Sequence, residues 1–120
     1  EQEDSIPPVT TKEIGEPNED GGYVIWPYTP IMLHATDEGG SGVNYIHYEI
    51  QWDMDMNGEW DESFDDTVYA EDVIILMQDY QILFGIVELS WYAVDNAPNI
   101  ADTHIQEHMV MEGLRWRVER

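Results

Sequence analysis

Apolar and polar residues alternate along several short stretches of the chain, which is the pattern of strands that bury one face. In each stretch every second side chain is apolar and is expected to face a core: Ile31, Leu33 and Ala35; Ile46, Tyr48, Ile50 and Trp52; Val87, Leu89, Trp91 and Ala93. A short apolar run covers residues 73–77, a last strand begins near Thr103, and residues 71–84 are ambiguous between helix and strand. Short strands separated by turn residues predict an all-β fold, an antiparallel β-sandwich.

The composition describes one acidic domain. The chain has 120 residues with 26 Asp and Glu against 4 Lys and Arg, a net charge of −22. Such a surface repels nucleic acid and anionic membranes, which are themselves polyanions, so we expect neither nucleic-acid binding nor membrane insertion. The longest apolar run is too short to cross a bilayer. No cysteine is present, and the first residue is Glu1, which fits a processed secreted product or an excised module.

Residues 53–61 carry the clearest chemical signal, because oxygen-bearing side chains recur there at the spacing of a loop that wraps a hard cation. Gly58 permits a sharp bend at the sixth position, and the seventh residue can offer its backbone carbonyl. The predicted ligands of a Ca²⁺ ion are Asp53, Asp55, Asn57, Glu59 and Asp61.

The same loop departs from an EF-hand in its context. The preceding residues alternate as a strand, and Phe64 occupies the twelfth position, where an EF-hand has a bidentate Glu. The loop is therefore closer to an acidic calcium hairpin of a β-protein, in which Asp61, Glu62, Asp65 or Asp66 closes the ligand shell. The alternative is a solvated acidic turn, since Asn57-Gly58 is also a strong turn signal.

The chain divides by pattern into three segments: residues 1–16, an extended N-terminal segment or linker; residues 17–112, the sandwich; and residues 113–120, a C-terminal strand extension. Residues 29–37, 40–43 and 45–49 resemble the first half of an Ig-like (fibronectin-III-like) repeat of archaeal and bacterial surface proteins. Residues 91–99 resemble its second half, and residues 7–17 its linker. The resemblance implies an Ig-like sandwich at the cell surface or outside the cell, and no particular chemistry.

A second acidic region follows from that fold. In an Ig-like sandwich the loops after Asp37 and Asp95 lie at the same end, opposite residues 53–61. Asp37, Asp95 and Asp102 are then candidate ligands of a second cation. Alternatively, these side chains accept backbone N–H bonds and cap turns.

Residues 104–108 match the His-x-x-Glu-His pattern of some zinc peptidases, which requires a helix. On a strand, His104 and His108 share one face and Glu107 points the other way. We expect a solvated strand face here and no enzymatic activity, since no Ser-His-Asp or Cys nucleophile arrangement is evident.

The C-terminal residues hold three of the four basic side chains, Arg115, Arg117 and Arg120. They alternate with apolar residues as in an amphipathic strand, which suits addition to the sheet edge of another molecule. The predicted self-assembly residues are Leu114, Arg115, Trp116, Arg117 and Val118. The alternative is that this strand pairs within its own sheet.

These features together predict a calcium-stabilised structural module of an extracellular assembly. Its expected partners are copies of itself, arranged head to tail as in a filament or pilus, or neighbouring Ig-like modules. The alternative is a carbohydrate- or protein-binding adhesion module that uses Trp26, Tyr28 and Trp60.

Overall fold

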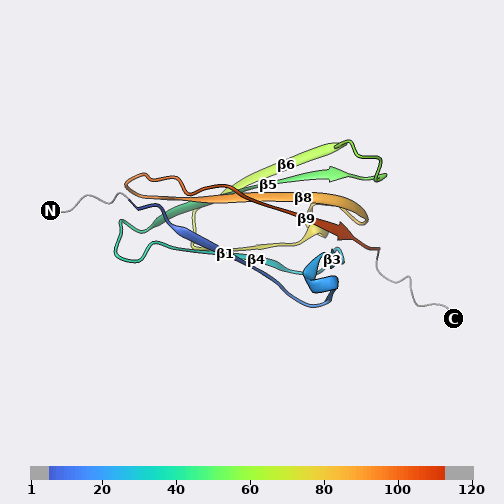
Figure 1. Cartoon of the computed structure of the whole chain (residues 1–120), viewed down its shortest axis with the longest axis horizontal. Coiled ribbons are helices and arrows are strands. Elements are labelled where there is room, and N and C mark those ends of the chain that lie inside the picture. The colour runs from blue at the N-terminus through green and yellow to red at the C-terminus, as the bar shows by residue number, and fades with distance from the viewer. Residues whose placement is uncertain (1–5, 113–120) are drawn as a thin grey trace.

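The structure is a computed structural model that describes residues 6–112 (Figure 1). Its strands form two sheets, one of three strands in the order β1-β4-β7 and one of six in the order β2-β3-β9-β8-β5-β6. The strands are β1 (Val9–Ile14), β2 (Asn18–Glu19), β3 (Val24–Ile25), β4 (Ile31–Thr36), β5 (Val43–Asp53), β6 (Glu62–Val68), β7 (Asp72–Ile75), β8 (Gly85–Asp95) and β9 (His104–Val110). Two short 3₁₀ helices, η1 (Asp20–Gly22) and η2 (Met77–Tyr80), complete the fold. The prediction of an all-β sandwich is confirmed.

The core lies between the two sheets and is built from the alternating positions. In the antiparallel pair β5–β8, Ile50 lies opposite Leu89 and Trp52 opposite Val87. All side chains predicted to face inward are buried: Ile31, Leu33, Ala35, Ile46, Tyr48, Ile50, Trp52, Val87, Leu89, Trp91 and Ala93. The period-two pattern therefore identified the central strands correctly, because one face of each is covered by the opposite sheet.

Residues 71–84, which the sequence left ambiguous, contain a strand followed by one turn of helix. β7 pairs with β4, and Val73 and Ile75 on its inner face are buried. η2 then places Met77 in the core and ends at Gln81, which has a left-handed backbone with φ 62°. The segment is too short and too interrupted for an amphipathic helix.

Part of the segment predicted as a linker belongs to the sandwich. All six residues of β1 pair with β4, from Val9 opposite Thr36 to Ile14 opposite Ile31. β1 is an edge strand of the three-stranded sheet. Prolines 7 and 8 directly precede it, as expected for residues that cannot donate to a ladder.

β6 is an edge strand that the hydrophobic pattern did not predict. It pairs antiparallel with β5, with Phe64 opposite Ile50 and Val68 opposite Ile46. The side that bears Phe64 and Val68 also bears Glu62 and Asp66, so the sequence of β6 lacks the regular apolar alternation of a strand and resembles that of a loop. Pairing with a strongly apolar neighbour decides its conformation.

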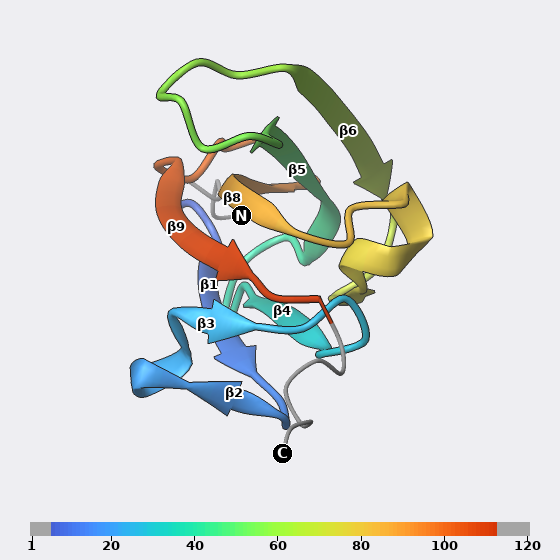
Figure 2. The ribbon, with the colours of Figure 1, turned by 90° about the vertical axis from the view of Figure 1, so that its right-hand side faces the viewer.

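The two ends of the sandwich carry different loops (Figures 1 and 2). β1 begins at one end, where residues 37–42 and 96–103 also lie. β9 ends at the other, where Val110 lies opposite Gly85 and Ile86 lies opposite Asp53, beside the β5–β6 hairpin. The acidic hairpin and the Asp37 and Asp95 loops are therefore at opposite ends, as predicted.

Candidate metal site

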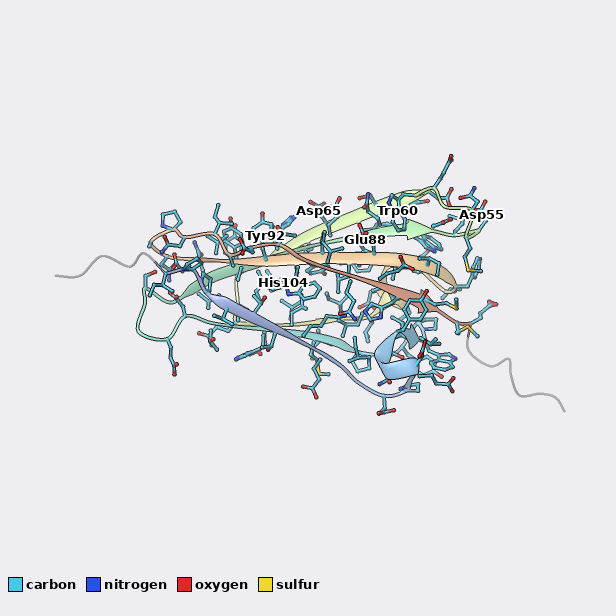
Figure 3. The ribbon with its side chains drawn as sticks, in the orientation of Figure 1. Asp55, Trp60, Asp65, Glu88, Tyr92 and His104 are labelled. Atoms are coloured by element: carbon cyan, nitrogen blue, oxygen red, sulfur yellow. The ribbon has the colours of Figure 1, made fainter. Side chains whose placement is uncertain are left out.

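Three carboxylates converge in the hairpin that connects β5 to β6. One ligand oxygen each from Asp53, Asp55 and Asp61 lies within 4.8 Å of the other two. Figure 3 shows Asp55 at the tip of this hairpin. Carboxylate oxygens at this spacing are the donors that hard divalent cations such as Ca²⁺ prefer. Within residues 6–112, this is the one group of three or more His, Asp or Glu side chains close enough to share an ion.

The hairpin backbone holds the buried member of this group in place. Asp53 is the last residue of β5, and its side chain accepts hydrogen bonds from the N–H groups of Asn57 (3.1 Å) and Gly58 (2.8 Å). Gly58 has a φ of 93°, a left-handed backbone conformation that favours glycine. A Cβ added there would meet no atom within 4 Å, so the glycine is explained by its backbone conformation and not by a lack of space. Two N–H groups thus orient Asp53 and leave its remaining lone pairs available to a cation.

Asp61 closes the hairpin from the other strand. Its N–H donates to the carbonyl of Trp52 (2.7 Å), and its carboxylate accepts from the N–H of Met54 (2.8 Å). Because both ends of the loop are tied together in this way, Asp53 and Asp61 are held near each other without an ion.

The start of β8 packs directly beneath the hairpin. A Cβ added to Gly85 lies 2.7 Å from the carbonyl oxygen of Asp53 and 2.9 Å from Nε1 of Trp52, and Gly85 has a φ of 111°. Trp52 Nε1 donates a hydrogen bond to the carbonyl of Phe84 (2.8 Å), which also holds the start of β8 against the end of β5. The base of the loop is therefore rigid, while Asp55 and Asp61 remain exposed.

The other predicted ligands are arranged differently. Asn57 Oδ1 accepts the N–H of Glu59 (2.9 Å), and its amide lies 3.4 Å from Asp55. The carboxylate of Glu59 is outside the group of three, which agrees with a role for its backbone carbonyl alone. Of the residues predicted to close the shell, Asp61 joins the group, whereas Glu62, Asp65 and Asp66 lie in β6.

No basic side chain neutralises this hairpin within the described part of the chain. The one Lys or Arg between residues 6 and 112, Lys12, contacts Gln106 and His108 rather than a carboxylate. Imidazole–carboxylate pairs occur elsewhere, at His34–Asp72 and His47–Asp65. Among the described residues, neutral N–H donors alone offset the mutual repulsion of the three Asp side chains here, and a bound cation would relieve it further.

At the opposite end, the predicted loops meet but form no comparable group. Asn96 donates from its N–H to the carbonyl of Gly42 (3.0 Å) and from Nδ2 to Ser41 (3.0 Å). Asp95 is fully buried and accepts the N–H groups of Ala97 (3.0 Å) and Asn99 (2.5 Å).

Asp37 accepts the N–H of Gly42 (2.9 Å), and Asp102 is exposed. The carboxylates of Asp37, Asp95 and Asp102 do not come together as a group of three within residues 6–112. The turn-capping alternative describes Asp37 and Asp95 as the structure has them, and a second cation site at this end stays a prediction.

The His-x-x-Glu-His residues lie on β9, so the helix that the zinc pattern needs is absent there. Glu107 points away from the two histidines, as expected for a strand. The expectation of a solvated face is wrong for His108, which is fully buried, whereas His104 is exposed and stacks on Trp91 with ring centres 5.4 Å apart.

His108 and Lys12 form a polar contact between the sheets that the sequence did not indicate. The Nζ of Lys12 lies 2.7 Å from Nε2 of His108, whose Nδ1 lies 3.3 Å from the carbonyl of Tyr23. Because an ammonium only donates, Nε2 accepts and Nδ1 carries the proton. Burial, followed by the Lys12 charge, lowers the pKa of His108 to about 4, and burial lowers the pKa of Lys12 to about 8.

The three aromatic residues of the alternative prediction, an adhesion module, lie at the end of the sandwich that carries the β5–β6 hairpin. Trp26 and Tyr28 lie in the turn between β3 and β4, and Trp60 lies in the hairpin. Trp60 is 42% exposed and lines a groove of about 300 Å³ beside the loop, which Asp53 and Glu107 line as well. The contribution of Glu107 was not predicted, because it comes from β9, far away in the sequence.

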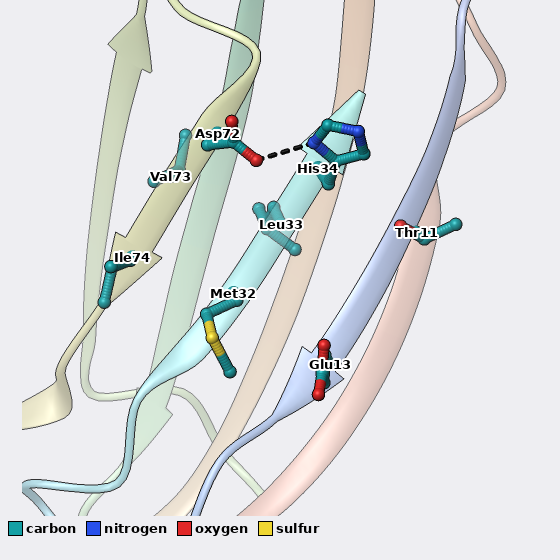
Figure 4. Close-up of a pocket in the computed structure, with 8 residues that line it drawn as sticks. All are labelled: Thr11, Glu13, Met32, Leu33, His34, Asp72, Val73 and Ile74. Carbon is teal, nitrogen blue, oxygen red and sulfur yellow. Dashed lines mark hydrogen bonds and ion pairs between the residues drawn. The ribbon is translucent and has the colours of Figure 1, made fainter. Parts of the chain in front are cut away.

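A second hollow lies on the outer face of the three-stranded sheet (Figure 4). It is lined by Met32, Leu33 and Ile74 and is crossed by the His34–Asp72 contact of 2.6 Å. Apolar and polar groups are mixed there without a convergent set of donors, so it offers no evident chemistry.

Comparison with known proteins gives no relative: no family model, no curated protein and no solved structure matches this chain. The resemblance to Ig-like surface repeats therefore stays a prediction. Within residues 6–112 no helix has the length and apolar character needed to span a membrane. The predicted self-assembly residues, Leu114 to Val118, lie outside the described residues.

Proposed function

We propose that this chain is a calcium-stabilised, Ig-like structural module of an extracellular or cell-surface assembly. The observation that carries the proposal is the convergence of Asp53, Asp55 and Asp61 within 4.8 Å. A cation that joins three carboxylates at a strand end stabilises the folded state, because the unfolded chain does not hold them together.

Calcium suits this loop better than magnesium. Asp53 and Asp61 are held by backbone N–H groups, whereas Asp55, at the exposed tip of the loop, accepts no backbone N–H bond of this kind among the described residues and can adjust. Ca²⁺ accepts six to eight oxygens in flexible geometry, whereas Mg²⁺ demands a near-ideal octahedron. The backbone carbonyl of Glu59 and water molecules can supply the further ligands.

The test is thermal unfolding with calcium and with a chelator. Extracellular modules bind calcium with dissociation constants of about 10⁻⁴–10⁻³ M, and a hundredfold excess over that constant stabilises a fold by about 2.7 kcal/mol. We expect chelation to lower the melting temperature and Asp55→Ala, which removes the ligand oxygens, to abolish the difference. Glu59→Gln is the matched control, because it removes the same charge from the same loop but from outside the group of three. Identical melting curves with and without chelator would refute the calcium site.

The structural role rests on charge and on the arrangement of the ends. A net charge of −22 disfavours polyanionic partners, and the first and last described strands begin and end at opposite ends of the sandwich. Contacts between unlike ends propagate without closing, which builds a filament from a single kind of module. Analytical ultracentrifugation in calcium at rising concentration tests this role. A chain that stays monomeric at high concentration contradicts it.

A recognition module is the second candidate, and the groove beside Trp60 favours it. An exposed indole with Asp53 and Glu107 nearby can stack on a sugar ring and accept hydroxyl hydrogen bonds. Titration with a panel of glycans, followed by tryptophan fluorescence, separates the two functions. Saturable binding that Trp60→Ala abolishes supports recognition, whereas a response to calcium alone supports the structural role.

A further inference from the structure

The last strand of the six-stranded sheet has an open edge. Among residues 6–112, β6 pairs with β5 on one side and with no strand on the other. The N–H of Thr67 donates to the side chain of the preceding residue, Asp66 (2.9 Å), instead of to a strand. Figure 2 shows β6 at the margin of the molecule. Unpaired N–H and C=O groups along such an edge are a template for another extended segment.

β6 is the edge that best fits a basic strand. It has seven residues, including the carboxylates Glu62, Asp65 and Asp66. Of the other edges, β2 has two residues and β7 has four, which is short for a paired strand. β1 has six residues but carries Lys12 and only one carboxylate, Glu13. Like charges facing each other also prevent β6 from pairing with another β6.

A groove beside β6 provides room for apolar side chains. It has a volume of about 520 Å³ and lies between the edge strand and η2. Phe64 and Tyr80 are in ring contact there, with centres 5.2 Å apart. Trp52, Met54, Glu62, Asp79 and Gln81 complete its walls. Alternate side chains of a strand added to β6 would point to this side, and the others to the side of Asp65.

The chain itself contains one segment with the matching pattern. In residues 114–119, Leu114, Trp116 and Val118 alternate with Arg115 and Arg117. The apolar set matches the groove on the side of Phe64, and the arginines match Asp65 on the other side of the strand. These residues lie outside the described part of the structure.

The segment cannot come from the same molecule. β6 lies three strand positions from β9, which is about 14 Å at 4.8 Å per strand. The N–H of Met111 donates to the carbonyl of Ile25 (2.8 Å), which ties the end of β9 toward β3, away from β6. From Met111 to Leu114 the chain advances by three residues, which span at most roughly 11 Å when extended, less than the distance to β6.

We propose that the free edge of β6 is the acceptor for residues 114–119 of a second copy of this chain, which add to the six-stranded sheet as a further strand. The proposal rests on the self-assembling function proposed above and specifies its contact. Backbone hydrogen bonds supply the affinity, and the alternation of arginine and apolar side chains supplies the specificity.

A pair of charge reversals tests the edge. Asp65→Lys places a cation on β6 beside the incoming arginines, whereas Glu13→Lys makes the same change on β1. We expect Asp65→Lys to weaken association in calcium about tenfold or more, which corresponds to 1.4 kcal/mol or above, and Glu13→Lys to leave it unchanged. Equal weakening by the two variants overturns the assignment to β6. Circular dichroism confirms that both remain folded.

Cysteine pairs then identify the contact directly, because the natural chain contains no cysteine. Copies with one cysteine on β6, at Ser63, Asp65 or Thr67, are mixed with copies carrying Arg115→Cys or Arg117→Cys and mildly oxidised. We expect disulfide-linked heterodimers for at least one β6 position and for none of the matched β1 positions, Thr11 and Glu13. Assembly with cross-links only to β1, or with none, refutes the β6 acceptor and leaves the filament intact. A chain that does not assemble at all refutes both proposals.

Discussion

His108 offers the most direct test of the packing between the sheets. Its imidazole is fully buried and accepts a hydrogen bond from the ammonium of Lys12. A second proton on His108 would be placed on Nε2, where it would face that ammonium as both a like charge and a second donor. The fold therefore rejects this proton, and the pKa of His108 is lowered from 6.5 to about 4.

The sign of the effect follows from proton uptake. Below pH 6.5 the unfolded chain binds a proton at this residue and the folded chain does not, so the free energy of unfolding falls as the pH falls toward 4. Between pH 7.5 and 4.5 the loss amounts to roughly 2–3 kcal/mol. For a chain of this size that corresponds to roughly 10 °C in melting temperature.

The many carboxylates also titrate in the acidic range, so the assay compares two proteins at each pH. In His108→Gln the amide keeps both hydrogen bonds, accepting from Lys12 and donating to Tyr23, but has no proton to gain. We expect the stability of wild type relative to this variant to fall by roughly 2–3 kcal/mol from pH 7.5 to 4.5, measured by urea unfolding. His104→Gln, on the same strand face but exposed, is the control. A relative stability that stays constant over this range would refute the buried contact with Lys12.

Three further outcomes are expected. Sodium chloride should raise the melting temperature of the calcium-free protein, because screening over about 10 Å at 0.1 M relieves self-repulsion; no change from low to moderate salt contradicts this. Gly85→Ala should destabilise the fold by about 1–3 kcal/mol, since its Cβ would meet the carbonyl oxygen of Asp53. Gly39 also has a positive φ but open space around it, so Gly39→Ala should lower the free energy of unfolding less. Equal losses of stability in the two variants argue against the clash. Asp95→Ala should lower the free energy of unfolding by roughly 3 kcal/mol because it removes the buried carboxylate that accepts the N–H groups of Ala97 and Asn99. Exposed Asp102→Ala should change it by under about 0.5 kcal/mol in the same denaturant assay.

The sequence predicted those strands whose alternation is carried by large apolar side chains. β5 and β8 were evident because Ile50, Trp52, Leu89 and Trp91 all face one side. β1 and β6 were not, because their inward positions include Lys12 and Asp66, and pairing with a neighbouring strand overrides weak local preference.

The hairpin group was predictable from spacing alone, since its members lie within nine residues of one another. The contact between Lys12 and His108 was not, because 96 residues separate them and only the fold brings β1 to β9. The same holds for Glu107 beside Trp60. A site formed by residues close together in the sequence can be predicted from their spacing. A contact between strands far apart in the sequence depends on the register and order of the strands, which spacing does not give.

The placement of β1 and β9 has a mechanical consequence. β1 starts at one end of the sandwich and β9 finishes at the other, and each is bonded along its length to an antiparallel neighbour, β4 and β8 respectively. A force that pulls these ends apart runs along the strands, perpendicular to their hydrogen bonds, so the bonds are loaded in shear and must break together. A module pulled by these two ends is expected to resist extension better than one whose terminal strands peel apart one bond at a time.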